Sequence, residues 1–346
     1  MAAMSRDTAK DLATLSALLV PLVGQDRADW ALATLAIDPA LADEAGGETA
    51  TRAQVAMALN IALFLDLLDR VPTAARYVER MRDAGEAIVL DHGALRTIDG
   101  ETGALPSGHG AFLRFLAPLG YEVAGLYPLP KLTMTGRAYV HVDLPESVPQ
   151  FFVSELHADQ LPEATRGAMA SVFGASVDPL GAVVTPLLGA LARDGNCALA
   201  DGVTIVKAAL RAFDRQHPAP KLADYEALLA HSKEAAWIAT EGNAFNHATT
   251  RVADVEAHAE ELKTAGFPLK PTVEVSRNGR VRQTAVLADK VARPFVLADG
   301  TEIFREVPGS FYEFISRDID PATGTLDLTF DSGNATGIFA VTQARP

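Results

Sequence analysis

The sequence contains a single cysteine, Cys197, so no disulfide bond can form within the chain. It has no run of five or more basic residues, and its net charge is −14 with a sequence pI near 5.0. A chain of this kind lacks the positive field that holds a phosphate backbone, so we expect no nucleic-acid partner. No stretch approaches the ~18 consecutive apolar residues that cross a bilayer, so we expect no membrane partner. The single cysteine argues against a secreted, cross-linked scaffold, so we expect a cytoplasmic location.

The motifs of several common enzyme sites are also missing. The chain has no glycine-rich dinucleotide or triphosphate loop, no Gly-x-Ser-x-Gly elbow and no His-Glu-x-x-His pair. Cys197 has no basic neighbours in the sequence that would activate its thiol, so we do not expect it to be a nucleophile. The hydrophobic content of 49% in 346 residues is nevertheless enough to fill the cores of two or three compact units.

One five-residue pattern, His-x-x-x-Arg, occurs twice in strand-like segments, at His92–Arg96 and at His247–Arg251. Side chains four residues apart on a strand share a face, so each copy would direct an imidazole and a guanidinium into one space. Imidazoles bind metals and guanidinium groups bind carboxylates. An aromatic strand with a carboxylate follows each copy, at Glu155 and at Glu313. We interpret the repetition as a duplicated module.

The apolar periodicity divides the chain into four regions. Residues 1–86 form an N-terminal helical region, 87–160 a first module, 161–240 a helical insertion, and 241–346 a second module with a C-terminal closing segment. Each module has the order strand, helix, strand, strand, strand. We therefore predict an α+β fold in which two β-α-β-β-β modules pair edge to edge around a shared cavity.

That cavity would hold a metal ion. His92, His247 and Glu313 supply two imidazoles and one carboxylate, the set that binds Fe(II) and leaves adjacent positions open for a substrate and O2. Zinc or manganese could use the same ligands, and Glu155 is the rival carboxylate or a fourth ligand. His141 could also face the cavity. The remaining histidines are expected at the surface, apart from His109, for which helix capping or solvent exposure is expected: His157, His217, His231 and His258.

A structural role instead of metal binding remains possible for the carboxylate of Glu313. Glu313 could form a buried ion pair with Arg251 or Arg317 and bind no metal at all.

Four segments resemble motifs of the 2-oxoadipate dioxygenase/decarboxylase family, which has a vicinal-oxygen-chelate-like fold. They are Asp91–Thr97, Asn246–Thr249, Val281–Thr284 and Phe311–Glu313, and Ala335–Phe339 resembles the substrate-contacting C-terminal loop of the family. The resemblance spans roughly residues 87 to 340. The glutamate segment departs from the family pattern, since it reads Phe-Tyr-Glu-Phe-Ile-Ser-Arg where longer members have Phe-Gly-Glu-Ile-Glu.

The resemblance implies an Fe(II)-dependent enzyme that converts 2-oxoadipate and O2 into 2-hydroxyglutarate and CO2, a step of lysine catabolism. It also implies that Arg96 binds a substrate carboxylate and that Gln283 and Asn334 make further polar contacts. Two alternatives remain. The fold could place a metal for nonredox glyoxalase-like or hydrolytic chemistry, or the chain could be a metal-free module that binds a small anion through Arg96, Arg251 and Arg317. The sequence leaves the oligomeric state open.

Overall fold

The computed structural model describes residues 12–42, 47–331, 333 and 340–342. Asn334 and the segment Ala335–Phe339 lie outside the described residues. The α-helices are α1 (Ala13–Val23), α2 (Gln25–Thr34), α3 (Arg52–Arg70), α4 (Pro72–Asp83), α5 (Gly110–Leu116), α6 (Arg166–Phe173), α7 (Val184–Asp194), α8 (Leu199–Arg211), α9 (Leu222–His231), α10 (Lys233–Glu241) and α11 (Val255–Thr264). None of these helices is long and apolar enough to cross a membrane.

Eight strands form the main sheet, in the order β3-β4-β5-β2-β7-β12-β9-β8. Their bounds are β2 (Leu90–Asp99), β3 (Tyr121–Leu129), β4 (Met134–His141), β5 (Gln150–His157), β7 (His247–Arg251), β8 (Glu274–Val275), β9 (Val281–Ala285) and β12 (Phe311–Arg317). Short pairs lie outside this sheet: β1 (Thr49–Thr51) with β6 (Asn196–Ala198), β10 (Lys290–Val296) with β11 (Glu302–Pro308), and β13 (Ile319–Asp320) with β14 (Thr325–Leu326).

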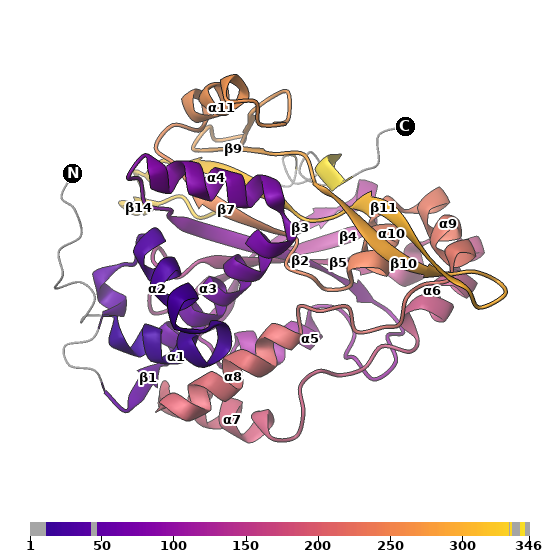
Figure 1. Cartoon of the computed structure of the whole chain (residues 1–346), viewed down its shortest axis with the longest axis horizontal. Helices are drawn as coiled ribbons and strands as arrows, with labels where there is room; N and C mark the ends of the chain where they lie inside the picture. Colours follow the sequence, from indigo (N-terminus) through magenta and orange to yellow (C-terminus); the bar gives the residue numbers. More distant parts are fainter. Residues whose placement is uncertain (1–11, 43–46, 332, 334–339, 343–346) are drawn as a thin grey trace.

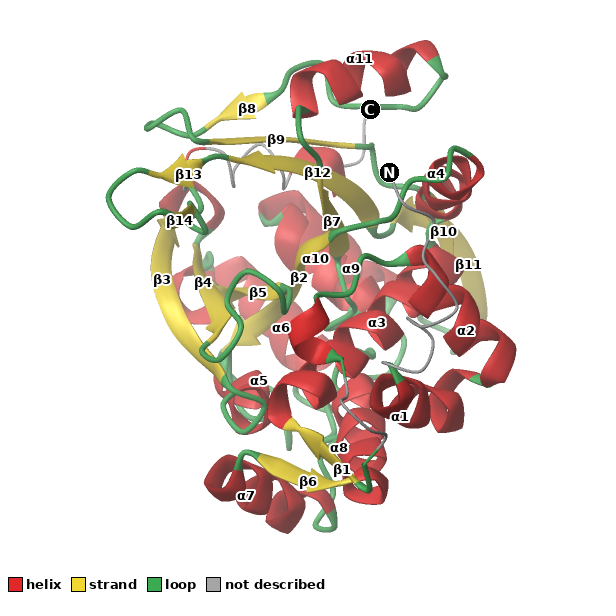
Figure 2. Cartoon of the chain, turned by 90° about the vertical axis from the view of Figure 1, so that its left-hand side faces the viewer, coloured by secondary structure: helices red, strands yellow, loops and turns green. Residues whose placement is uncertain are grey.

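The sheet consists of two halves with the same internal order. In each half the first strand lies beside the last, β2 beside β5 and β7 beside β12, and both of these pairs are parallel. The halves join where β2 and β7 pair antiparallel, with Ala94 opposite His247. A helix follows the first strand of each half, α5 in one and α11 in the other. The predicted α+β fold with duplicated β-α-β-β-β modules is therefore confirmed, and Figure 2 shows the sheet curving around its inner face.

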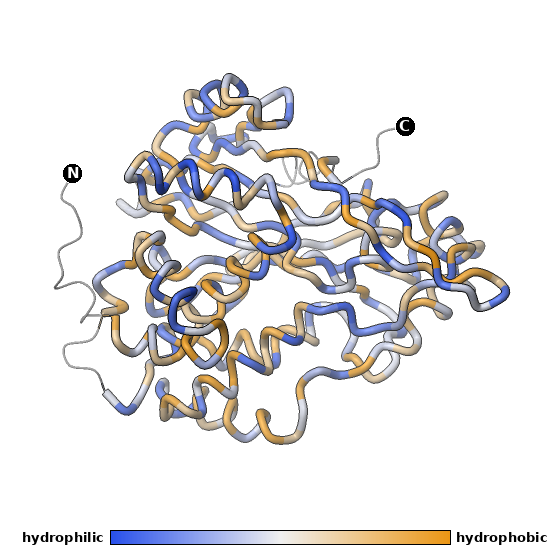
Figure 3. The backbone as a smooth tube through the Cα atoms, viewed as in Figure 1, coloured by the Kyte–Doolittle hydropathy of each residue, from blue (hydrophilic) through white to orange (hydrophobic). Residues whose placement is uncertain are grey.

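Strand alternation separates the helical core from the inner face of the sheet. On β2, Leu95 points into a large apolar core that also contains Leu59 of α3 and Ile205 of α8. His92 and Arg96 point to the opposite face. Apolar residues recur along α1, α3 and α8 (Figure 3), which pack against one another, and α3 also contacts β7 of the sheet.

The long core helix α3 begins at a capping box. The Thr51 hydroxyl accepts a hydrogen bond from the backbone N–H of Gln54, and the Gln54 side chain accepts one from the backbone N–H of Thr51. This satisfies two backbone donors at the start of a helix whose side chains are mostly buried.

Two features differ from the sequence interpretation. The hairpin of β10 and β11 was not predicted, and it is inserted between β9 and β12 (Figure 1). The region 161–240 is helical as predicted, but its helices go to two places: α8 packs against α1 and α3, whereas α6, α9 and α10 pack together. The residue boundaries of the four regions stay a prediction.

Candidate metal centre

Three neighbouring strands bring His92, His247 and Glu313 together. Thr249 on β7 lies directly opposite His92 of β2 on one side and Glu313 of β12 on the other. His247 is two residues before Thr249 and therefore on the same face of β7. One ligand atom from each of the three side chains lies within 4.8 Å of the others.

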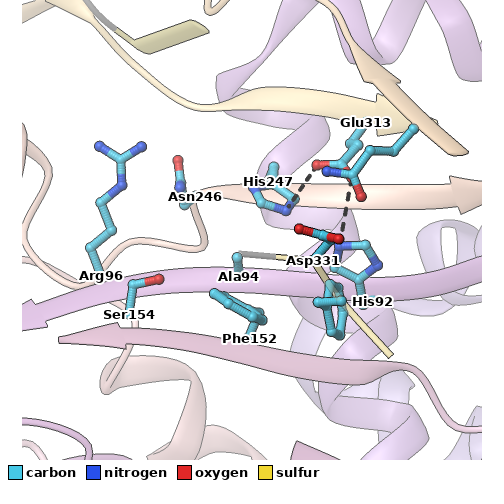
Figure 4. Close-up of a pocket in the computed structure, with 11 residues that line it drawn as sticks. His92, Ala94, Arg96, Phe152, Ser154, Asn246, His247, Glu313 and Asp331 are labelled. Carbon is cyan, nitrogen blue, oxygen red and sulfur yellow. Dashed lines mark ion pairs between the residues drawn. The ribbon is translucent and has the colours of Figure 1, made fainter. Parts of the chain in front are cut away.

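The three side chains converge on one point in Figure 4. The His247 Nε2 atom is 3.4 Å from Glu313 Oε2, and the His92 Nε2 atom is 3.9 Å from Glu313 Oε1. Metal–ligand bonds of about 2.1 Å place neighbouring donor atoms about 3 to 3.5 Å apart, so a small contraction would bring the group around one ion. The donor set suits a divalent transition metal and matches the two-histidine, one-carboxylate arrangement of non-haem iron sites.

Buried polar atoms without partners support this fit. Among the described residues, neither ring nitrogen of His247 has a hydrogen-bond partner, and neither does Glu313 Oε1. Both side chains are almost fully buried, with exposed fractions of 6% and 2%. Unpaired buried polar groups cost free energy, and a cation bound between them would remove that cost.

Burial also sets the protonation states at the centre. It lowers the pKa of His92, with Asp91 acting in the opposite direction, and it lowers the pKa of His247 well below the ordinary value. Both imidazoles are thus neutral and can donate a lone pair to a metal. Burial raises the pKa of Glu313 well above its ordinary value, and Lys270 offsets this only in part.

Asp91 orients His92 from behind. Its Oδ1 atom is 2.8 Å from His92 Nδ1, which leaves Nε2 directed at the centre. Arg317 donates to the same carboxylate through Nε at 3.0 Å and Nη2 at 2.9 Å. Burial alone would raise the pKa of Asp91, but Arg317 and the hydrogen bond from His92 hold it well below its ordinary value. A carboxylate behind a ligand histidine fixes the tautomer and the ring orientation.

Glu313 does not form the ion pair with Arg251 or Arg317 that the structural alternative expects. Arg317 pairs with Asp91, and Arg251 lies 3.8 Å from Asp91 and donates to the carbonyl oxygen of Glu146. Neither arginine forms an ion pair with Glu313 in the described part of the chain. Arg251 also does not reach the space that it was expected to share with His247.

A pocket opens beside the three donors. Its empty volume is about 470 Å³, counting space open to solvent. Arg96 and Gln283 both line it, as expected of residues that meet a substrate, whereas Asn334 lies outside the described residues. The other lining residues are His92, Ala94, Phe152, Ser154, Asn246, His247, Glu313, Phe330 and Asp331.

Arg96 has a partner that the sequence analysis missed. Its Nη1 atom is 2.6 Å from Glu234 Oε2 of α10, and its guanidinium lies over the Trp237 ring at 4.5 Å. Glu234 and Trp237 are three residues apart on a helix, so they share a face. A carboxylate on the same helix face as the apolar Trp237 was the available signal.

The rival ligands lie elsewhere. Phe152 and Ser154 of β5 face the pocket, so Glu155 faces the other way, where it pairs with Arg137 and accepts a hydrogen bond from the backbone N–H of His109. The buried His141 ring accepts from the backbone N–H groups of Asp143 and Leu144.

Only one of the four histidines expected at the surface is exposed. His231 is exposed, as predicted, but His217 is buried and contacts the Phe173 ring. His157 and His258 are half-buried, the first between Asp99 and Thr135.

Three comparisons place the chain among known proteins. Residues 57–324 match the model of the family 2-oxoadipate dioxygenase/decarboxylase. The chloroplastic 2-oxoadipate dioxygenase/decarboxylase of Arabidopsis thaliana is 26% identical over 309 residues, which cover 80% of this chain and 74% of that protein.

Two solved structures are similar to the chain. A protein from Ralstonia eutropha JMP134, named as a glyoxalase superfamily protein, is 48% identical with a TM-score of 0.88 and covers 92% of this chain and 98% of its own. The hydroxyglutarate synthase of Oryza sativa, in complex with 2-oxoadipate, has a TM-score of 0.65 at 21% identity and covers 84% and 93%. That likeness concerns the fold. The family match spans more than half of the chain, and the chain belongs to the 2-oxoadipate dioxygenase/decarboxylase family.

Proposed function

We propose that this protein is an Fe(II)-dependent dioxygenase/decarboxylase that converts a 2-oxo acid and O2 into CO2 and a 2-hydroxy acid one carbon shorter. The observation that carries the proposal is the buried group of His92, His247 and Glu313 at one end of a pocket in a member of this family. The reference substrate is 2-oxoadipate, giving 2-hydroxyglutarate, because the related synthases of Oryza sativa and Pseudomonas putida were solved with 2-oxoadipate.

The residues of the pocket have distinct roles in this proposal. His92, His247 and Glu313 hold the metal, and Asp91 keeps the His92 ring in position through its Nδ1 atom. Bound iron supplies the redox chemistry between O2 and the 2-oxo acid. The Gln283 carboxamide offers a hydrogen bond to a substrate oxygen. Asn334 remains a further polar contact predicted from the sequence alone.

Aromatic side chains keep water away from the centre. The Phe330 ring lies 4.9 Å from the His92 ring and 5.0 Å from the Phe152 ring, centroid to centroid. Such a wall limits solvent access and protects reactive species from side reactions.

One alternative has an observation in its favour. The Ralstonia relative is named after the glyoxalase superfamily, in which a metal can act as a Lewis acid without redox change. A nonredox glyoxalase-like or hydrolytic reaction would consume no oxygen. The metal-free anion-binding alternative loses support, because Arg251 and Arg317 are both directed at Asp91 and only Arg96 lines the pocket.

Oxygen consumption tests the proposal. The protein is loaded with Fe(II) under anaerobic conditions and mixed with oxygenated buffer and a panel of 2-oxo acids that includes 2-oxoadipate. We expect one CO2 released per O2 consumed with at least one acid of the panel, and at least a hundredfold loss in His247→Ala. The control His231→Ala changes an exposed histidine and should retain activity. Iron binding without oxygen uptake for any acid would favour the nonredox alternative.

A further inference from the structure

We propose that the end of the pocket remote from the metal selects 2-oxo acids whose far end is an uncharged hydrogen-bonding group, such as a carboxamide, over acids with a second carboxylate. This inference rests on the proposed function and specifies its substrate class. Three observations carry it: the ion pair of Arg96, an unpaired acceptor at Asn246, and the spacing of His92 and Arg96 along β2.

The remote end is built around Arg96. Figure 4 shows Arg96, Asn246 and Ser154 at one end of the pocket, with His92, His247 and Glu313 at the other. His92 and Arg96 are four residues apart on β2, which corresponds to about 13 Å along a strand. A substrate held at the metal through its 2-oxo acid group therefore needs a side chain of several carbons to reach this end.

The charge of Arg96 is already neutralised. Its Nη1 atom lies 2.6 Å from Glu234 Oε2, the two side chains are 1% and 3% exposed, and Nη2 donates to the Thr342 hydroxyl at 3.0 Å. A second carboxylate bound here would share one guanidinium with Glu234 in a site shielded from water. Two carboxylates this close repel one another strongly, so one of them would have to take up a proton.

The neighbouring residue Asn246 has a buried side-chain oxygen that lacks a hydrogen-bond donor in the described part of the chain. Its side-chain oxygen is buried and has no hydrogen-bond partner among the described residues, and the residue is 3% exposed. A carboxylate has only acceptor atoms and leaves this oxygen unpaired, whereas an amide N–H or a hydroxyl can donate to it. An unsatisfied buried acceptor costs free energy, so a ligand that satisfies it gains affinity.

The test compares two substrates of nearly equal shape. They are 2-oxoadipate and its ω-amide, in which the carboxylate remote from the keto group is replaced by a carboxamide. We expect the iron-loaded wild-type protein to show a kcat/KM at least tenfold higher for the amide in oxygen uptake. A tenfold preference for 2-oxoadipate, or equal values, would overturn the inference while leaving the proposed function intact.

A variant assigns the preference to Glu234. Glu234→Gln removes the carboxylate that neutralises the Arg96 guanidinium, so the ratio of the two kcat/KM values should move at least tenfold towards 2-oxoadipate. The matched control is Glu241→Gln, which removes the other buried carboxylate of the same helix, paired with the partly exposed Arg293 at 2.7 Å outside the pocket. An equal change of the ratio in both variants would contradict the role of Glu234.

A binding measurement distinguishes failure of the substrate preference from failure of the proposed function. Should no 2-oxo acid be turned over, calorimetry of the iron-loaded protein with the two compounds under anaerobic conditions still decides the inference. Tighter binding of the amide supports it, and tighter binding of the dicarboxylate overturns it. Failure of the proposed function would instead appear as iron binding without oxygen uptake for any acid of the panel. If Glu234→Gln does not fold, the wild-type preference alone decides.

Discussion

Asp91 connects the metal centre to the rest of the molecule, because its carboxylate forms a hydrogen bond with His92 and an ion pair with Arg317. Arg317 also donates to the carbonyl oxygens of Asp327 and Thr329, just before the pocket residue Phe330. One buried carboxylate therefore holds a ligand ring in place and, through Arg317, is tied to the chain segment that forms the aromatic wall.

We expect Asp91→Asn to weaken divalent metal binding about 10- to 100-fold, the usual effect of removing a carboxylate behind a ligand histidine. Competition with a chromophoric chelator measures the affinity for Co(II) or Zn(II). The control Glu241→Gln removes another buried carboxylate, which pairs with Arg293 at 2.7 Å outside the pocket. Unchanged affinity in folded Asp91→Asn would show that His92 does not depend on Asp91.

Cys197 should react slowly in the folded protein. Burial, together with the nearby Asp201, raises the pKa of its thiol to about 11. At pH 8 only about one molecule in a thousand then carries the thiolate, whereas a thiol of ordinary pKa is about one quarter ionised. Alkylation by iodoacetamide, followed by mass spectrometry, should be at least a hundredfold slower in native than in urea-unfolded protein and should accelerate as the pH rises towards 11.

The metal ligands that could be predicted from the sequence are those that lie in a repeated motif. His92 and His247 occupy matching positions of two similar segments, and this repetition indicates a shared site. Glu234 could not be found this way, because nothing local indicates that a helix of the insertion meets Arg96 on a distant strand. Asp91 and Asn246 precede the two histidines in the sequence, but only the fold shows that one is paired and the other is not.

At the level of elements, the junction of β2 with β7 depends on a missing side chain. A Cβ atom added at Gly93 would lie 1.9 Å from Cζ of the Phe245 ring. That ring is 3% exposed and packs near Phe151 and Phe213, so it has little room to move. The Phe245 ring can pack directly against β2 beside its pairing with β7, because Gly93 has no side chain.

We expect Gly93→Ala to destabilise the protein by about 1 to 3 kcal/mol through overpacking. Chemical denaturation followed by circular dichroism gives the free energy of unfolding. The matched control is Gly167→Ala in α6, where a new Cβ would meet nothing within 4 Å and alanine favours the helix. A loss of stability no larger than that of the control would mean that the Phe245 ring relaxes freely.

The helices and strands could be predicted from the sequence where their apolar residues are regularly spaced. The strands of both modules and the helices α5 and α11 follow from short apolar runs and three- and four-residue spacing. The β10–β11 hairpin lacks such a pattern, since it carries Pro294 and charged residues, and nearly all of its residues are exposed or half-buried. Its strands are held by pairing with each other, which local sequence hardly reveals.

The molecule as a whole is tied together by a core and by the metal centre. One hydrophobic core contains residues from all four regions, among them Leu59, Leu95, Ile205 and Phe311. The metal donors also come from both halves of the sheet, His92 from the first and His247 and Glu313 from the second. A bound ion therefore joins two halves that already share their packing.

A metal that binds only the folded protein should raise the midpoint of the whole thermal transition. At a free concentration 100 times its dissociation constant, it adds about 2.7 kcal/mol of stability. Differential scanning calorimetry with and without Co(II) should show one transition that moves to higher temperature, and no shift in His92→Ala or Glu313→Gln, which each remove one donor. The control His231→Ala should shift like the wild type, because that side chain is exposed. A transition that splits, with only one part responding to metal, would mean that the halves unfold separately; an equal shift in Glu313→Gln would place the ion elsewhere in the molecule.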